Sequence, residues 1–106
     1  MIDMFQRLYD AVLARRGRDP STSRTAKLLA AGRNKMAQKV GEEAVEVAID
    51  AARNSRAGVV TESADLIYHL VVLWAEMGIE PADIWAEMQR REKACGIAEK
   101  LPKQAA

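Results

Sequence analysis

Four acidic residues form two pairs with the same spacing, Glu43 with Glu46 and Glu62 with Asp65. Residues three apart on a helix lie on one face, so each pair can present two carboxylates to a neighbouring helix. Carboxylates that converge repel one another unless some are protonated or cations lie between them. Oxygen ligands without His or Cys favour Mg²⁺ or Mn²⁺, and a magnesium ion completes its shell with water and phosphate oxygens. The spacing therefore suits metal-assisted chemistry on a phosphate.

The distribution of charge fits the same chemistry. Residues 40–87 hold ten Asp/Glu against two Lys/Arg, whereas residues 1–39 hold three against nine and residues 88–106 two against five. Such blocks can be no more than solvated faces. They also suit a metal bound to a polyphosphate, with carboxylates for the metal and Lys/Arg for the phosphates.

Two other interpretations of the acidic pairs have to be weighed. Glu is a good helix former and E-x-x-E is common by chance, so the residues could be surface carboxylates with no shared site. A di-iron bundle would need Glu-x-x-His from two helices, and the one histidine, His69, follows Asp65 by four residues. The sequence argues against that bundle and favours a packing or second-shell role for His69.

The composition is that of a single soluble domain. The chain has 106 residues, of which 49 % are hydrophobic and 29 % charged. No apolar run approaches the roughly 20 residues of a membrane span, and no secretory signal is visible at the amino terminus. We therefore expect a cytoplasmic protein whose partners include neither a nucleic acid nor a membrane. A lone Cys95 and a lone histidine exclude an internal disulfide and a structural zinc site.

Apolar residues recur at helical spacing along most of the chain, and no alternating strand pattern appears. Helices are predicted over residues 2–15, 24–31, 34–54, 59–77 and 79–94. Thr22 or Ser23 would cap the second helix, Asn34 the third, and Gly78 would end the fourth. These elements predict an all-α fold, an antiparallel bundle of four to five helices in one domain over residues 1–100, with a disordered tail at 101–106.

The fourth predicted helix is apolar around most of its circumference, and the third carries a second apolar ridge at Val45 and Ile49. One small bundle cannot cover that much apolar surface. The pattern predicts a homodimer.

Two segments carry a resemblance to a known family. "KVGEEAVEV" followed by "TESADLIYHL" resembles the all-α NTP pyrophosphohydrolases, the MazG-like superfamily, whose signature is E-x-x-E and then E-x-x-D. Within it the chain resembles the phosphoribosyl-ATP pyrophosphohydrolase family, through "TAKLLAAGRNKMAQKVGEEAVE", "ADLIYHLVVLWAEMGI" and "RREKACGIAEK". The resemblance covers roughly residues 4–100. Two departures are Arg24, where members often have an aromatic residue, and Cys95, where a small polar residue is usual.

The resemblance implies a dimeric α-helical enzyme of histidine biosynthesis that hydrolyses phosphoribosyl-ATP to phosphoribosyl-AMP and pyrophosphate, with Mg²⁺ as the cofactor and Mn²⁺ as the alternative. A housecleaning pyrophosphohydrolase of non-canonical nucleotides would use the same metal chemistry. A non-catalytic helical scaffold would share only the burial pattern.

Candidate roles follow from the resemblance and the chemistry together. Glu43, Glu46, Glu62 and Asp65 are the expected metal ligands, and Glu42 is either a further ligand or the group that orients the attacking water. Lys39 is the best candidate for a phosphate contact, although a salt bridge to Glu43 explains it equally well. The weaker candidates for substrate binding are Lys27, Lys35, Arg24, Thr25 and Arg33.

Overall fold

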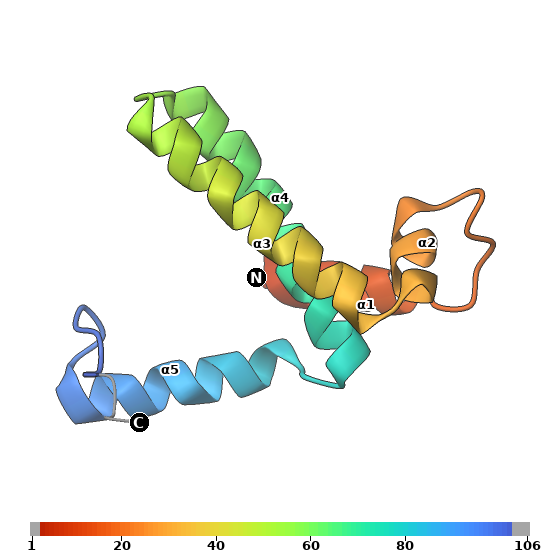
Figure 1. Cartoon of the computed structure of the whole chain (residues 1–106). Helices are drawn as coiled ribbons and strands as arrows, with labels where there is room; N and C mark the ends of the chain where they lie inside the picture. Colours follow the sequence, from red (N-terminus) through yellow and green to blue (C-terminus); the bar gives the residue numbers. More distant parts are fainter. Residues whose placement is uncertain (1–2, 103–106) are drawn as a thin grey trace.

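The computed structural model describes residues 3–102 and consists of five α-helices, with a long loop at residues 14–23 and short connections elsewhere (Figure 1). The helices are α1 (Met4–Leu13), α2 (Arg24–Ala31), α3 (Arg33–Ala52), α4 (Arg56–Met77) and α5 (Pro81–Cys95). No strand occurs among residues 3–102, so the predicted all-α class is confirmed. Residues 103–106 of the predicted tail lie outside the described part of the chain.

Two helices begin earlier than predicted, for local reasons. α3 begins at Arg33, because Gly32 turns the chain with φ 98° and no side chain caps the helix; the Asn34 cap was wrong. α4 begins at Arg56 instead of residue 59, because Ser55 accepts a hydrogen bond from the Gly58 N–H and caps its first turn. The predicted cap at Ser23 and the end of α4 at Gly78 are confirmed.

The hydrophobic core lies where α1, α3 and the second half of α4 meet. Its buried residues are Tyr9, Val12, Met36, Val71, Val72 and Ala75, and side chains of α2 pack against them. Arg16, just after α1, donates a 2.8 Å hydrogen bond from Nη2 to the Ala75 carbonyl near the end of α4. These contacts make a closed base, which we define as α1, α2, the start of α3 and residues 68–77 of α4.

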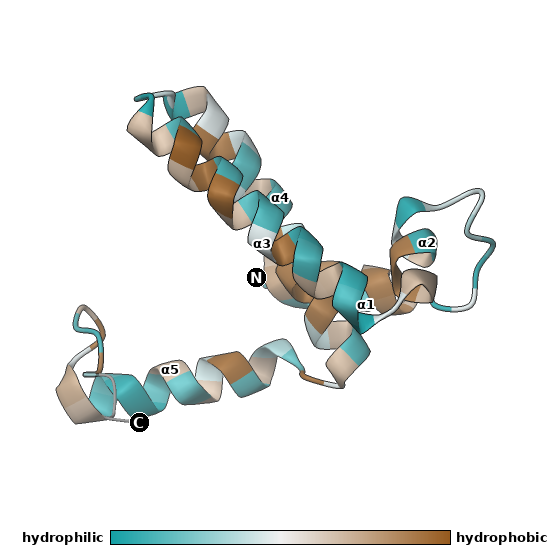
Figure 2. Cartoon of the chain, viewed as in Figure 1, coloured by the Kyte–Doolittle hydropathy of each residue, from teal (hydrophilic) through white to brown (hydrophobic). Residues whose placement is uncertain are grey.

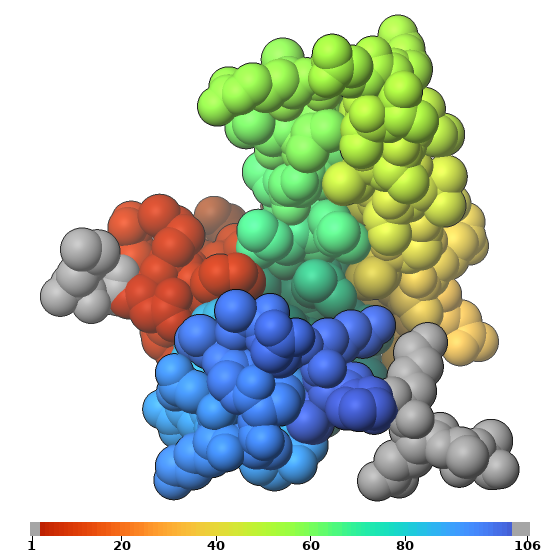
Figure 3. All heavy atoms as spheres, turned by 90° about the vertical axis from the view of Figure 1, so that its left-hand side faces the viewer, coloured from red at the N-terminus to blue at the C-terminus, as the bar shows by residue number. Residues whose placement is uncertain are grey.

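Beyond this base, α3 and α4 run antiparallel as a long hairpin (Figures 1 and 3). We call residues 43–67 the outer hairpin. None of its residues is buried, and several of its large apolar side chains are exposed: Val60 is 59 % exposed, Val45 57 % and Ile49 46 %. Figure 2 shows hydrophobic segments, in brown, along the helices of this hairpin. The prediction that α4 is apolar over most of its surface is right, but a single chain covers only its second half.

α5 leaves the base and lies apart from the hairpin (Figure 1). Its first turn has a capping box in which the Glu80 N–H donates to Asp83, and the helix begins at Pro81 instead of residue 79. Trp85 joins α5 to α1: its ring meets Phe5 edge-on at 5.1 Å and its indole N–H donates to Asp3.

By length and hydropathy alone, one helix among the described residues, α4, could cross a membrane. Glu62 and Asp65 lie within it, and ionised carboxylates in a bilayer are costly. An apolar helix that needs cover from protein explains the composition better.

Candidate metal and phosphate site

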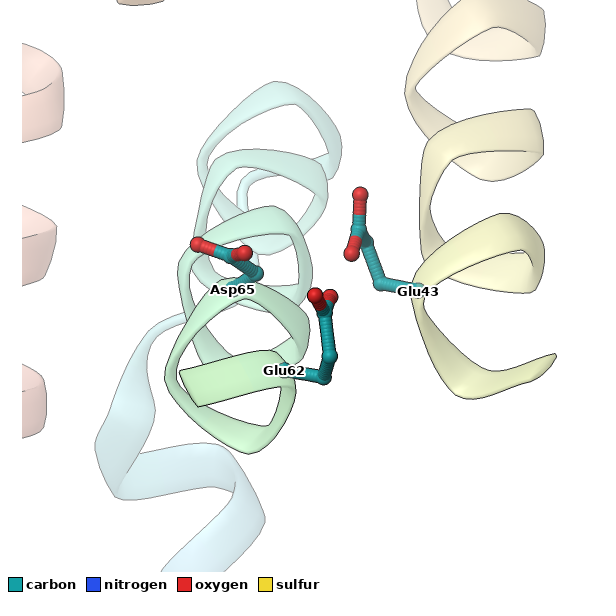
Figure 4. A group of neighbouring side chains, drawn as sticks. All are labelled: Glu43, Glu62 and Asp65. Carbon is teal, nitrogen blue, oxygen red and sulfur yellow. The ribbon is translucent and has the colours of Figure 1, made fainter. Parts of the chain in front are cut away.

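Three of the four predicted metal ligands converge between α3 and α4. Glu43 extends from α3 toward Glu62 and Asp65 on α4 (Figure 4). One carboxylate oxygen from each residue lies within 4.8 Å of the others. Glu43 and Glu62 are half-buried and Asp65 is exposed, so the group lies at the surface of the hairpin, open to a ligand. We call these three residues the acidic cluster.

The cluster shows the repulsion that its geometry implies. The pKa of Glu62 is raised above its ordinary value, first by a hydrogen bond shared with Glu43, then by desolvation and by the charges of Glu43, Asp65 and Asp50. A raised carboxyl pKa means that the ionised form is destabilised. A cation between the three carboxylates would relieve that destabilisation.

The fourth predicted ligand, Glu46, is not part of the group of three. It lies one turn beyond Glu43 on α3, with an exposed side chain that forms no ion pair within residues 3–102.

Glu42 points to different partners. Its Oε1 accepts a 2.7 Å hydrogen bond from Gln38, and its Oε2 lies 3.4 Å from the Lys39 ammonium. The Gln38 bond, with the charge of Lys39, lowers the pKa of Glu42. Lys39 thus pairs with Glu42 and not with Glu43, the partner considered from the sequence.

His69 lies one turn after Asp65 on α4, with its Nε2 3.9 Å from Glu43 Oε1. Desolvation, followed by the charge of Lys39, lowers the pKa of His69 against the opposing charges of Asp65 and Glu42. Its Nδ1 is buried without a hydrogen-bond partner in the described structure. The imidazole is therefore a neutral neighbour of the cluster, as a second-shell role predicts.

The other basic candidates lie in α2 and in the first turn of α3. Arg24 and Lys27 line a hollow of about 330 Å³ together with residues 20–23. Lys35 and Arg33 lie exposed in the first turn of α3. The hydroxyl of Thr25, another candidate for substrate binding, lies 2.6 Å from the Tyr68 hydroxyl.

Sequence reasoning missed two residues at the site, Asp50 and Tyr68. Asp50 adds to the charge that raises the pKa of Glu62. It can pack there because residue 58 is glycine: a Cβ at that position would lie 2.6 Å from the Asp50 Oδ2. The presence of Gly58 in an apolar helix was the available signal. Nothing in the spacing signalled the contact between Tyr68 and Thr25, which are 43 positions apart.

Comparison with known proteins adds an independent line of evidence. The sequence profile described as phosphoribosyl-ATP pyrophosphohydrolase matches residues 5–92. The chain is 60 % identical over 103 residues to phosphoribosyl-ATP pyrophosphatase 2 of Rhodopseudomonas palustris, covering 97 % of this chain and 79 % of the relative. It is 59 % identical to the protein of that name from Bradyrhizobium diazoefficiens, over 99 % of this chain and 78 % of the relative. The chain is also 56 % identical to phosphoribosyl-ATP pyrophosphatase of Gluconobacter oxydans, over 92 % of this chain and 73 % of the relative.

Proposed function

The chain belongs to the phosphoribosyl-ATP pyrophosphohydrolase family, and we propose that it hydrolyses phosphoribosyl-ATP to phosphoribosyl-AMP and pyrophosphate in histidine biosynthesis. The observation that supports this most strongly is the convergence of Glu43, Glu62 and Asp65 within 4.8 Å. A phosphohydrolase of this kind depends on a metal, and three oxygen donors without nitrogen or sulfur suit Mg²⁺, with Mn²⁺ as a substitute.

Each residue has a role in this proposal. Glu43, Glu62 and Asp65 hold the metal, and Glu46 joins them as the fourth ligand. When bound, magnesium neutralises the triphosphate oxygens and lowers the pKa of a water.

The basic residues bind the phosphates. Lys39, beside the cluster, and Arg24 and Lys27, at the start of α2, neutralise the phosphate oxygens and the charge of the departing pyrophosphate. Lys35 and Arg33 are the more distant candidates. Glu42 is the weaker candidate for orienting water, since Gln38 and Lys39 occupy both its oxygens.

We also propose that the protein is a homodimer in the cytoplasm. Val45 and Ile49 on α3 and Val60 and Ile67 on α4 are between 36 % and 59 % exposed on the outer hairpin. Four large apolar side chains on neighbouring helices favour burial against protein, and a second copy offers the same surface.

The test is a pyrophosphate-release assay with phosphoribosyl-ATP beside ATP, GTP and non-canonical nucleoside triphosphates, each with Mg²⁺ and with EDTA. We expect turnover with Mg²⁺ and a clear preference for phosphoribosyl-ATP. A preference for non-canonical triphosphates would instead indicate a housecleaning enzyme, and no release from any substrate would favour a scaffold.

A further inference from the structure

We propose that Tyr68 is a positioning residue: its hydrogen bond to Thr25 fixes the start of α2, with Arg24 and Lys27, against the helix that carries Glu62 and Asp65. This rests on the proposed function, because it assigns Arg24 and Lys27 to the phosphates of the substrate. Tyr68 itself touches neither metal nor substrate in this proposal.

The hydrogen bond is short and crosses between two helices. The two hydroxyl oxygens lie 2.6 Å apart, and both residues are half-buried. Among residues 3–102 it is the one side-chain hydrogen bond that joins α2 to another helix. Leu28 and Leu29 of α2 also pack against the hydrophobic core, but such apolar contacts are non-directional.

The anchored segment is rigid and carries the basic residues. Ser23 accepts a 3.1 Å hydrogen bond from the Ala26 N–H, and the Lys27 N–H donates to the Ser23 carbonyl. Arg24 precedes Thr25 directly and Lys27 follows it by two positions. Fixing the Thr25 hydroxyl therefore fixes the backbone from which both cations extend.

The other end of the bond is close to the acidic cluster. Tyr68 follows Asp65 by three residues, about 4.5 Å along the helix axis. Its ring meets His69 edge-on with centroids 5.0 Å apart, and the His69 Nε2 lies 3.9 Å from Glu43 Oε1. Tyr68 thus adjoins the residues that hold the metal and the segment that offers cations to the phosphates.

The hydrogen bond could either stabilise the fold alone or also position the charges, and these two roles predict different effects when the bond is removed. Loss of a structural bond lowers the melting temperature and leaves the affinity for a nucleotide unchanged. Loss of a positioning bond lowers the affinity as well, because Arg24 and Lys27 must then be ordered when the nucleotide binds.

The experiment measures the dissociation constant of α,β-methylene-ATP with Mg²⁺ by calorimetry, which needs no turnover. The variants are Tyr68→Phe, Thr25→Val, the double variant, and Thr25→Ser, which keeps the hydroxyl. Val12→Ala is the control, because Val12 is buried in the base and its truncation lowers stability away from the site.

We expect about a fivefold weaker affinity in Tyr68→Phe, in Thr25→Val and in the double variant, since the same hydrogen bond is lost in all three. Thr25→Ser and Val12→Ala should bind as the wild type does.

Three results would overturn the proposal: unchanged affinity in Tyr68→Phe, an equal loss in Val12→Ala, or additive losses in the double variant. Pyrophosphate release from phosphoribosyl-ATP is measured in parallel for the wild type and Tyr68→Phe, where we expect a higher KM and a nearly unchanged kcat. A wild type that binds the analogue but releases no pyrophosphate would refute the proposed reaction, while the binding comparison would still decide the role of Tyr68.

Discussion

The base and the outer hairpin share the two long helices α3 and α4, but only the base also contains α1 and α2, and the two regions differ in how far their side chains are buried. In the base, Val71 and Val72 of α4 are fully buried against α1 and α3. In the outer hairpin no residue is buried, and the carboxylates of the acidic cluster lie beside exposed valines and isoleucines. The base is complete within one chain, whereas the outer hairpin presents surfaces that suit a cation and a second copy.

The largest expected effect comes from neutralising a carboxylate that would bind the cation in the outer hairpin. Asp65→Asn and Glu46→Gln should each lower Mg²⁺-dependent pyrophosphate release by about 100-fold or more, because each removes one charged oxygen ligand. The helical circular dichroism should stay intact. Glu92→Gln, on α5 and away from the cluster, is the control.

The two substitutions test different parts of the assignment. Normal turnover in Asp65→Asn would contradict the metal site itself. Normal turnover in Glu46→Gln alone would restrict the ligands to the three residues that already converge, Glu43, Glu62 and Asp65.

The second test concerns the exposed apolar surface. Val60→Asp should convert a dimer to a monomer at micromolar concentration, because an unpaired carboxylate in an apolar interface is costly. Light scattering after gel filtration measures the mass. Met88→Asp is the matched control, since Met88 is 43 % exposed on α5, outside the outer hairpin. A monomeric wild type, or a dimer broken only by Met88→Asp, would contradict the proposed interface.

A third test compares buried and exposed valines by urea denaturation. Val71→Ala should lower the free energy of unfolding by about 2 kcal/mol at every protein concentration, since one chain forms its surroundings. The effect of Val45→Ala should decrease on dilution, because Val45 is 57 % exposed and gains cover only in a dimer. An effect of Val45→Ala that is independent of concentration would mean that a single chain buries this residue.

The sequence predicted the contacts that depend on helical spacing. Glu43 on α3 faces the Glu62 and Asp65 pair on α4, which helical periodicity can indicate, whereas Glu46, the other member of the first predicted pair, is not part of the group. The start of α4 was predicted at residue 59, just after Gly58, whereas the helix begins at Arg56. In the structure Gly58 is helical, and its missing side chain makes room for Asp50.

Other features depend on tertiary contacts that no local pattern encodes. The bond between Tyr68 and Thr25 exists because α2 folds back onto α4, 43 positions along the chain. The pairing of Lys39 with Glu42 in place of Glu43 follows from the inward turn of Glu43 toward the cluster. Spacing made both partners of Lys39 equally plausible, and packing selected one.

The smallest expected effect is the dependence of stability on pH in the metal-free protein. The pKa of Glu62 is raised in the folded state above its ordinary value of 4.5. The folded protein therefore binds this proton more tightly than the unfolded chain does, and its stability falls as the pH rises through the unfolded pKa toward the folded one. Glu62→Gln carries no charge at any pH, so with EDTA it should melt at a higher temperature than the wild type at pH 7 and show a flatter profile down to pH 4. Mg²⁺ should raise the melting temperature of the wild type more than that of Glu62→Gln, because it neutralises the same repulsion. Glu92→Gln should follow the wild type throughout. If the melting temperatures of Glu62→Gln and the wild type change with pH in parallel, the carboxylates do not repel one another in solution. The outer hairpin, like the base, would then need no cation to stabilise it.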